Sequence, residues 1–423
     1  MYKDTTSAFY PQGHLTSGWQ VAIEGKEATC RAEQALTVER ALNWRLEEEV
    51  DAELGERGRP LGGVSSRWKC DTCDSSLRKN FRRNGHYRRR LLTLEGMVTL
   101  RVPLIRCKCG TYVKVSWKML PSRQRKWCDV TIGGLEHYLS GASYRKTAAL
   151  MSHEVGAHVS HMAGWVDMQR AGRAAREVKK QLTCPEVVIL DEMYVSVAGA
   201  KKTFLLVTDT DGHILLYGGP CKRSPEDWQQ VLDRLTRLGV SPEHGLKAVV
   251  ADGDRSIRIA VAMVWGQIKV QTCVWHVLNA VYAEARRVFG ETSALVKAVV
   301  NDARAVLMHE TRTEESLRKA AARLAEFVKK YVGQPWVDTV ARSFAEATAY
   351  LRSPELPRTN GTAERAIKEI RRRVKTMDGF KSQQGAMNFM AIFVQWYNWL
   401  RDCAQTIAQL SRPRNLKTAS SSS

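Results

Sequence analysis

Runs of hydrophobic and β-branched residues mark a sheet in the centre of the chain. The segments EVVILDEMYVSVAG and KTFLLVTDTDGHILLYGGP predict three strands, because Asp211-Gly212 between hydrophobic runs is typical of a hairpin turn. An amphipathic helix follows in SPEDWQQVLDRLTRLG, with Ser224 as its N-cap and Pro225 at its first position. The short runs LKAVVADG and IKVQTC predict two buried strands that flank a helix near 255–265.

The predicted order over 185–273, β-β-β-α-β-α-β, is that of an α/β fold with an RNase H-like core. Residues 277–352 show helical patterns without a strand, and the Gly-rich linker GERGRPLGGVSS predicts a domain boundary near residue 60. We therefore expect seven segments: an N-terminal helical segment at 1–60, loosely ordered over 1–27 and helical from Ala28 to Leu54; a small basic, Cys-containing β unit at 61–120; a helical region at 121–182; the first part of the core at 183–276; an all-helical insertion at 277–355; the C-terminal helices of the core at 356–405; and a disordered tail at 406–423.

The charge of the chain narrows the classes of partner. Lys plus Arg number 65 against 44 Asp plus Glu, so the 423 residues carry a net charge of +21. This charge favours a polyanion, nucleic acid first. No run approaches the roughly 18 apolar residues of a membrane span, and the N-terminus lacks a signal-peptide pattern. We expect a cytoplasmic, nucleoid-associated protein with no membrane partner, whose ten cysteines are thiols or metal ligands.

Two aspartates occupy positions that the predicted sheet would bring together. Asp191 lies within the first hydrophobic strand, where an unpaired carboxylate is costly to bury, and Asp252 ends the fourth strand. Neighbouring carboxylates favour a hard divalent cation, Mg²⁺ or Mn²⁺. Asp191 alone is also compatible with a strand-edge acid, and Asp252 with a loop cap. Asp209, Asp211 and Asp254 are alternatives that rank lower, as turn residues.

A third acid lies in the basic stretch RTNGTAERAIKEIRRRVK. Glu364 heads this predicted helix, and an acid on a helix after the sheet would complete a two-metal site for phosphoryl transfer. The alternative is an exposed helix face, on which Glu364 pairs with Lys368 and Glu369 with Arg373 at i,i+4 spacing. From the stretch alone, the exposed face is the simpler interpretation.

Four blocks in this order resemble those of the Mutator-like DDE transposases of bacterial insertion sequences: DEMYVSV, VVADGD, QTCVWHVLNA and RTNGTAERAIKEIRRR. In that family a Gly follows the second Asp, a C-x2-H pair comes next, and a helical insertion precedes a catalytic Glu in a T-N-x-x-x-E-R helix. Here Asp252 precedes a Gly, Cys273 and His276 form the pair 21 residues after Asp252, and Glu364 falls in the last block. The resemblance covers about residues 185–400.

The resemblance implies a DNA transposase with a DDE active site of Asp191, Asp252 and Glu364 on two Mg²⁺ ions. Such an enzyme cleaves at the element ends and joins the freed 3′-hydroxyl to target DNA. Its partner would be double-stranded DNA, both terminal repeats and target, and a homo-oligomer is expected because two ends must be held together. The basic side chains beside Glu364 would hold the DNA backbone: Arg365, Lys368, Arg371 and Arg372.

Other interpretations of these residues stay open. For Cys273 and His276 the resemblance implies a role at the edge of the active site, either in folding a loop or in touching DNA. The alternative is a buried Cys beside a His that binds a backbone carbonyl. For the whole chain the alternatives are an RNase H-like nuclease that does not join strands, and a domesticated transposase that acts as a DNA-binding regulator.

The N-terminal half contains a candidate zinc site. Cys70 and Cys73 form a C-x2-C pair, and Cys107 and Cys109 form a C-x-C pair, with a predicted hairpin about Gly96 between them. Four thiolates would make a zinc-ribbon-like unit, although such ribbons usually have two C-x2-C pairs; reduced cysteines in a small β unit are the alternative.

The stretch ASYRKTAALMSHEVGAHVSHMAGWVDMQRAG predicts a helix, a turn at Gly156 and a second helix. This order suits a helix-turn-helix, whose second helix would enter a major groove of DNA. An ordinary helical hairpin that packs on the core is the alternative. The candidate DNA-binding residues here are Arg145, Lys146, His158, Ser160 and His161.

Overall fold

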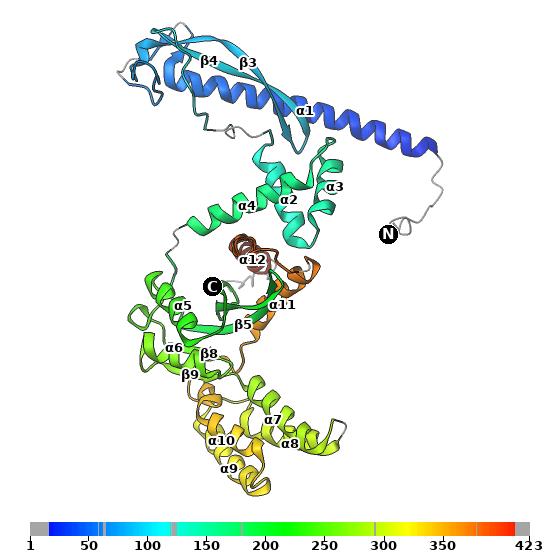
Figure 1. The fold of residues 1–423 in the computed structure, drawn as a ribbon, viewed down its shortest axis with the longest axis vertical. Helices are drawn as coiled ribbons and strands as arrows, with labels where there is room; N and C mark the ends of the chain where they lie inside the picture. Colours follow the sequence, from blue (N-terminus) through cyan, green and yellow to red (C-terminus); the bar gives the residue numbers. More distant parts are fainter. Residues whose placement is uncertain are drawn as a thin grey trace, which may run out of the picture. The chain divides into compact units, whose positions relative to one another are not determined.

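The structure is a computed structural model of the chain (Figure 1). It describes residues 17–57, 59–61, 65–118, 120, 125–178, 181–291, 293–377 and 379–410. The chain divides between Asp167 and Met168 into two compact units. Within the described ranges, no helix combines the length and the apolar character needed to cross a membrane.

The first unit begins with the long helix α1 (Ser17–Leu54), which packs along a two-stranded hairpin. Its Leu42 and Leu46, one helical turn apart, are buried against hydrophobic residues of the hairpin. Strands β1 (Gly55–Glu56) and β2 (Arg59–Pro60) form a small ladder, and the turn η1 (Arg78–Asn80) leads into the hairpin. The helix starts earlier than the predicted Ala28, so the prediction of a loosely ordered start was wrong from residue 17 on; residues 1–16 lie outside the described part.

Strands β3 (Phe81–Thr93) and β4 (Gly96–Cys107) pair antiparallel and confirm the predicted hairpin about Gly96. Strand β3 begins well before the hydrophobic run that starts at Leu91. Its first part, FRRNGHYRRR, carries polar side chains on both faces, so the alternation that usually reveals a strand is missing. Pairing with the hydrophobic β4 determines its conformation instead.

Three helices follow: α2 (Cys128–Ser140), α3 (Tyr144–Glu154) and α4 (His161–Glu177). The Ser143 side chain caps α3 by accepting a hydrogen bond from the backbone N–H of Lys146. Gly156, with φ of +62°, lies in the turn between α3 and α4. The predicted order of helix, turn at Gly156 and helix is confirmed.

The second unit contains a five-stranded mixed sheet in the order β7-β6-β5-β8-β9. Strands β5 (Val187–Val197), β6 (Ala200–Asp209) and β7 (Ile214–Cys221) form an antiparallel meander. Strands β8 (Ala248–Ala251) and β9 (Lys269–Thr272) continue the sheet parallel to β5. All five predicted strands are therefore present, in the predicted sequence order.

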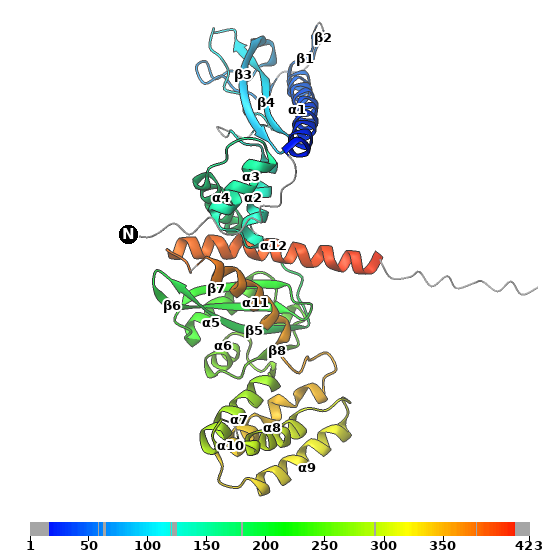
Figure 2. The same ribbon diagram turned by 90° about the vertical axis from the view of Figure 1, so that its right-hand side faces the viewer.

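Helices α5 (Pro225–Arg237) and α6 (Arg255–Trp265) cover one face of this sheet, while α11 (Gly361–Thr376) lies against β5 and β6 (Figure 2). Ser224 caps α5 and Pro225 is its first residue, as predicted, and Ser224 forms a capping box with Asp227 as well. Alternate residues of β5 enter different cores. Val188 and Leu190 pack with Trp228 of α5, whereas Ile189 packs with residues of the helical insertion.

The helical insertion comprises α7 (Val274–Phe289), α8 (Ala294–Leu307), α9 (Glu314–Lys330), α10 (Pro335–Ala347) and the turn η3 (Ala349–Leu351). A separate turn, η2 (Pro242–His244), lies between α5 and β8. No strand interrupts it in the described residues between 274 and 352, as predicted. The last helix, α12 (Gln383–Leu410), extends past the expected start of a disordered tail at 406. The remainder of that expected tail, residues 411–423, lies outside the described part.

Candidate active site and metal centres

The pairing of β5 with β8 brings two of the predicted acids to the same end of the sheet. Ile189 is paired with Val250 in a parallel register. Asp191 in β5 and Asp252 directly after β8, each two residues further along, are therefore level with each other at the ends of a pairing about 4.8 Å wide. Asp191 is buried and Asp252 has a side chain that is 17% exposed.

Helix α11 adds the third acid. Glu364 lies in its first turn and lines the same cavity of about 690 Å³ as Asp191 and Asp252. The structure contains no ion pair of Glu364 with Lys368 among the residues described. Three predicted carboxylates that lie far apart in the sequence thus face one cavity.

Hydrogen bonds hold the Asp191 carboxylate at both oxygens. The backbone N–H of Glu192 donates to Asp191 Oδ1 at 2.7 Å, and the amide of Asn360 donates to Asp191 Oδ2 at 2.9 Å. Asn360 is fully buried, and the Sγ of Cys273 donates to its Oδ1 at 3.1 Å. Asn360 therefore connects the C-x2-H pair to the first acid, a connection that the sequence did not reveal.

The electrostatics of this cluster suit a cation. Burial and, after it, the negative charges of Asp252 and Glu364 together raise the pKa of Asp191 to about 7. A divalent cation between these oxygens would offset both effects. The donor set, three carboxylates that converge on a polar cavity, fits the oxygen preference of Mg²⁺ or Mn²⁺.

Sequence reasoning missed Arg223, which lies beside these acids. Its guanidinium contacts Glu192 at 2.5 Å and Asp254 at 2.7 Å, and it lies 3.8 Å from Asp252. Arg223 follows β7 directly before the cap of α5, and no motif marks that position. Only the fold brings this loop to the end of β8.

The C-x2-H pair lies at the start of α7, not before the insertion. Cys273 is the buried N-cap residue, and His276 lies in the first turn and lines the cavity. One candidate ligand atom from each of Cys273, His276 and Glu364 falls within 4.8 Å of the other two. The Nδ1 atom of His276 is buried without a hydrogen-bond partner in the described structure, so the alternative of a His bound to a backbone carbonyl is not found at that atom.

The basic side chains of α11 divide into two groups. Arg365, Lys368 and Arg371 line the cavity of the acids. Arg372, also predicted to bind DNA, instead pairs with Glu369 at 3.0 Å on the exposed surface. Glu369 was expected to pair with Arg373, but Arg373 is buried and donates to Thr376.

The four cysteines of the first unit converge at the base of the hairpin. The sulfurs of Cys70 and Cys109 are 3.5 Å apart, and those of Cys73 and Cys107 are 3.6 Å apart. Tetrahedral zinc, with Zn–S bonds of about 2.3 Å, requires S–S separations of about 3.8 Å. Hydrogen bonds from Thr111 lower the pKa of the Cys109 thiol to about 6, which favours a thiolate. The cluster is compatible with zinc despite its C-x-C pair.

Replacing Cys107 with serine is expected to abolish zinc binding and to lower the unfolding temperature of the first unit. Cys107 is buried between the hairpin and α1, so loss of the metal would remove a link worth on the order of several kcal/mol. Metal analysis and thermal unfolding followed by circular dichroism measure both effects. Cys128→Ser, at an exposed cysteine outside the cluster, is the control and should retain about one zinc per chain. Equal zinc contents in the two variants would contradict the site.

The candidate DNA-binding residues around the helix-turn-helix are all exposed. Arg145 and Lys146 lie in the first turn of α3, whereas His158 lies in the turn before α4 and His161 begins that helix. The Ser160 hydroxyl accepts a hydrogen bond from the backbone N–H of Ala163 at 3.2 Å, so it is engaged at the helix start. Of the candidate DNA-binding residues His158, Ser160 and His161, only His161 lies on α4.

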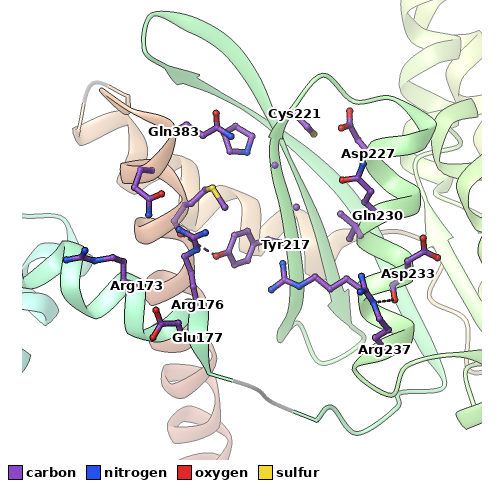
Figure 3. A pocket seen from close by; sticks show the side chains of 17 residues that line it. Arg173, Arg176, Glu177, Tyr217, Cys221, Asp227, Gln230, Asp233, Arg237 and Gln383 are labelled. Atoms are coloured by element: carbon purple, nitrogen blue, oxygen red, sulfur yellow. Dashed lines mark hydrogen bonds between the residues drawn. The ribbon is translucent and has the colours of Figure 1, made fainter.

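A second hollow, of about 890 Å³, lies in the second unit and contains none of the predicted residues. Figure 3 shows Arg173 and Arg176 of α4 and Arg237 of α5 around it, with Tyr217 of β7 between them. Arg234 of α5 also lines the hollow. Each of the two helices therefore contributes a pair of arginines at i,i+3 spacing. Sequence reasoning did not single out these arginines, because their spacing is common on helix surfaces.

Comparison with known proteins identifies the family. The family model described as "Transposase, Mutator family" matches residues 64–401. A chain of the "CryoEM structure of simian T-cell lymphotropic virus intasome in complex with PP2A regulatory subunit B56 gamma" is similar at 11% identity over 53% of this chain and 74% of that one, with a TM-score of 0.18. No curated protein matches this chain. Because the family model covers most of its length, the chain belongs to the Mutator family of transposases.

Proposed function

We propose that the chain is a DDE-type transposase of an insertion sequence, which cleaves DNA at the element ends and transfers the freed strand to target DNA. The observation that carries this proposal is the convergence of Asp191, Asp252 and Glu364 on one cavity beside a basic helix face. Membership of the Mutator family supports it. The sheet, a three-stranded meander followed by two parallel strands, supports an RNase H-like core.

In this proposal the three acids hold two divalent ions, Mg²⁺ or Mn²⁺, which would activate the attacking oxygen and stabilise the leaving one. Asn360 and the backbone N–H of Glu192 fix the carboxylate of Asp191. The cavity-lining residues Arg365, Lys368 and Arg371 would bind the phosphates on either side of the scissile bond. The same acids serve both hydrolysis and strand transfer, so no covalent enzyme intermediate is needed.

The first unit would recognise the terminal repeats in double-stranded DNA. The exposed arginines of β3 on the zinc-ribbon-like hairpin suit backbone contacts, and α4 suits a major groove. Because two element ends are joined in one reaction, the active form would be a homo-oligomer. Nucleoid association would follow from the net charge of +21.

The proposal is tested with a labelled duplex that carries the gene's own flanking sequence. Wild-type protein with Mg²⁺ or Mn²⁺ is expected to nick this duplex at the element boundary and to join the new 3′-hydroxyl to a second DNA. Sequencing gels resolve both products. Cleavage without joined products would indicate a nuclease, and binding without cleavage in either metal would indicate a regulator; either result would contradict the proposed transposase.

A further inference from the structure

Five carboxylates surround or adjoin the candidate metal cavity, although a DDE site uses three. Glu192 lines the cavity together with Asp191, Asp252 and Glu364, and Asp254 follows two residues after Asp252. All five are acceptable ligands for a hard cation by chemistry alone. The structure must therefore distinguish the three acids that bind metal from the two that do not.

Arg223 makes this distinction through its contacts. Its Nε lies 2.5 Å from Glu192 Oε2, and its Nη2 lies 2.7 Å from Asp254 Oδ2. Its Nη1 donates to the hydroxyl of Tyr194 at 2.9 Å. The guanidinium thus donates hydrogen bonds to Tyr194 and Asp254 and forms an ion pair with Glu192, while Asp252 Oδ2 lies 3.8 Å away, beyond a direct hydrogen bond.

The partners of Arg223 are themselves fixed. Glu192 has a side chain that is only 5% exposed and accepts from the indole N–H of the buried Trp228 at 3.4 Å. Asp254 caps α6 by accepting from the backbone N–H of Ser256 at 2.7 Å. The backbone of Arg223 has a φ of +76°, a left-handed conformation that non-glycine residues rarely adopt. The surrounding structure thus imposes this conformation on Arg223.

We propose that Arg223 is a positioning residue that sorts the carboxylates of the active site. It holds Glu192 and Asp254 in ion pairs, so that only Asp191, Asp252 and Glu364 remain to bind divalent ions. This inference rests on the proposed DDE chemistry. Without the sorting, extra carboxylate oxygens would fill positions on the ions that water and DNA phosphate must occupy.

Arg223→Met removes the charge and keeps most of the side-chain length. Mn²⁺ affinity, measured by titration calorimetry at fixed pH and salt, is expected to rise by about tenfold, because a positive charge near Asp252 is lost and two carboxylates are released. The rate of DNA cleavage is expected to fall in the same variant. A residue that only supported the fold would lower both quantities together, so weaker Mn²⁺ binding in Arg223→Met would overturn the proposal.

A rescue variant separates sorting from direct contact with DNA. In Arg223→Met combined with Glu192→Gln and Asp254→Asn, the two competing carboxylates are absent, and Gln can still accept the hydrogen bond from Trp228. Cleavage is expected to recover relative to the single variant, and Mn²⁺ affinity to return toward wild type. Failure to recover would overturn the sorting role.

Two controls complete the experiment. Arg286→Met removes an ion-paired arginine of α7 that does not line the cavity, and it should leave Mn²⁺ affinity unchanged. A comparable rise of affinity in Arg286→Met would attribute the effect to net charge and overturn the proposal. Asp252→Asn, made in a chain that retains Arg223, should weaken Mn²⁺ binding. If it does not, the proposed metal site itself is wrong, which is a result distinct from failure of the Arg223 variants.

Discussion

Replacing Glu364 with glutamine is expected to lower the rate of DNA cleavage by about 10³-fold or more while DNA binding persists. The variant keeps the shape of the side chain but removes a charged oxygen ligand, and metal ions contribute several kcal/mol to phosphoryl transfer, at about 1.4 kcal/mol per factor of ten. Single-turnover cleavage of the end duplex measures the rate, and fluorescence anisotropy measures binding to the same DNA.

Glu369→Gln is the matched control on the same helix. Glu369 lies five residues further along and pairs with Arg372 on the exposed surface, so its loss should change stability by no more than about 0.5 kcal/mol and leave cleavage near wild type. Equal cleavage by Glu364→Gln and wild type would return Glu364 to the role of a helix-surface acid. The search for a third ligand would then turn to Asp254, which Arg223 holds in this structure.

The sheet of the second unit was predictable because its strands are uniformly hydrophobic or follow a recognisable turn. Asp211-Gly212 and the capping signal of Ser224 are local features, and the structure reproduces both. The proximity of Asp191 and Asp252 was predicted from the order of the strands. The observed parallel register agrees with it, because Asp191 and Asp252 each lie two residues after the paired Ile189 and Val250. Placing Glu364 depended on a family resemblance, because its helix has the charge pattern of an exposed surface.

Other features depend on contacts that no local pattern encodes. Arg223 reaches Glu192 and Asp254 only after β7, β5 and β8 are assembled, and its neighbours in sequence gave no hint of a buried acid. The first half of β3 lacks a hydrophobic period because its partner strand supplies the apolar residues. Arg373 appeared to belong to a basic surface, yet the packing of α11 buries it.

Replacing Asn360 with aspartate is expected to lower cleavage by about 100-fold, the upper end of the range for residues that orient metal ligands. The new carboxylate would place an oxygen, in place of the amide N–H, 2.9 Å from Asp191 Oδ2, so two acceptors would face each other in a fully buried site. Asn360→Ala should have a smaller effect, because it removes the hydrogen bond without adding a charge. Its free energy of unfolding should fall by about 1–3 kcal/mol, measured by urea denaturation.

If Asn360 orients Asp191, Cys273, which hydrogen-bonds to Asn360, should contribute to cleavage as well. Cys273 donates to Asn360 Oδ1, so Cys273→Ser, which retains a donor, should cleave at nearly the wild-type rate, and Cys273→Ala should lie between Cys273→Ser and Asn360→Ala. Measuring cleavage and urea stability for all four variants separates orientation from folding. If Asn360 orients Asp191, the variants should lose more cleavage activity than their loss of stability explains. If Asn360 only supports the fold, the folded fraction of Asn360→Asp should be fully active. If Asn360→Asp and wild type cleave alike, the link from the C-x2-H pair through Asn360 to Asp191 does not orient the metal ligand.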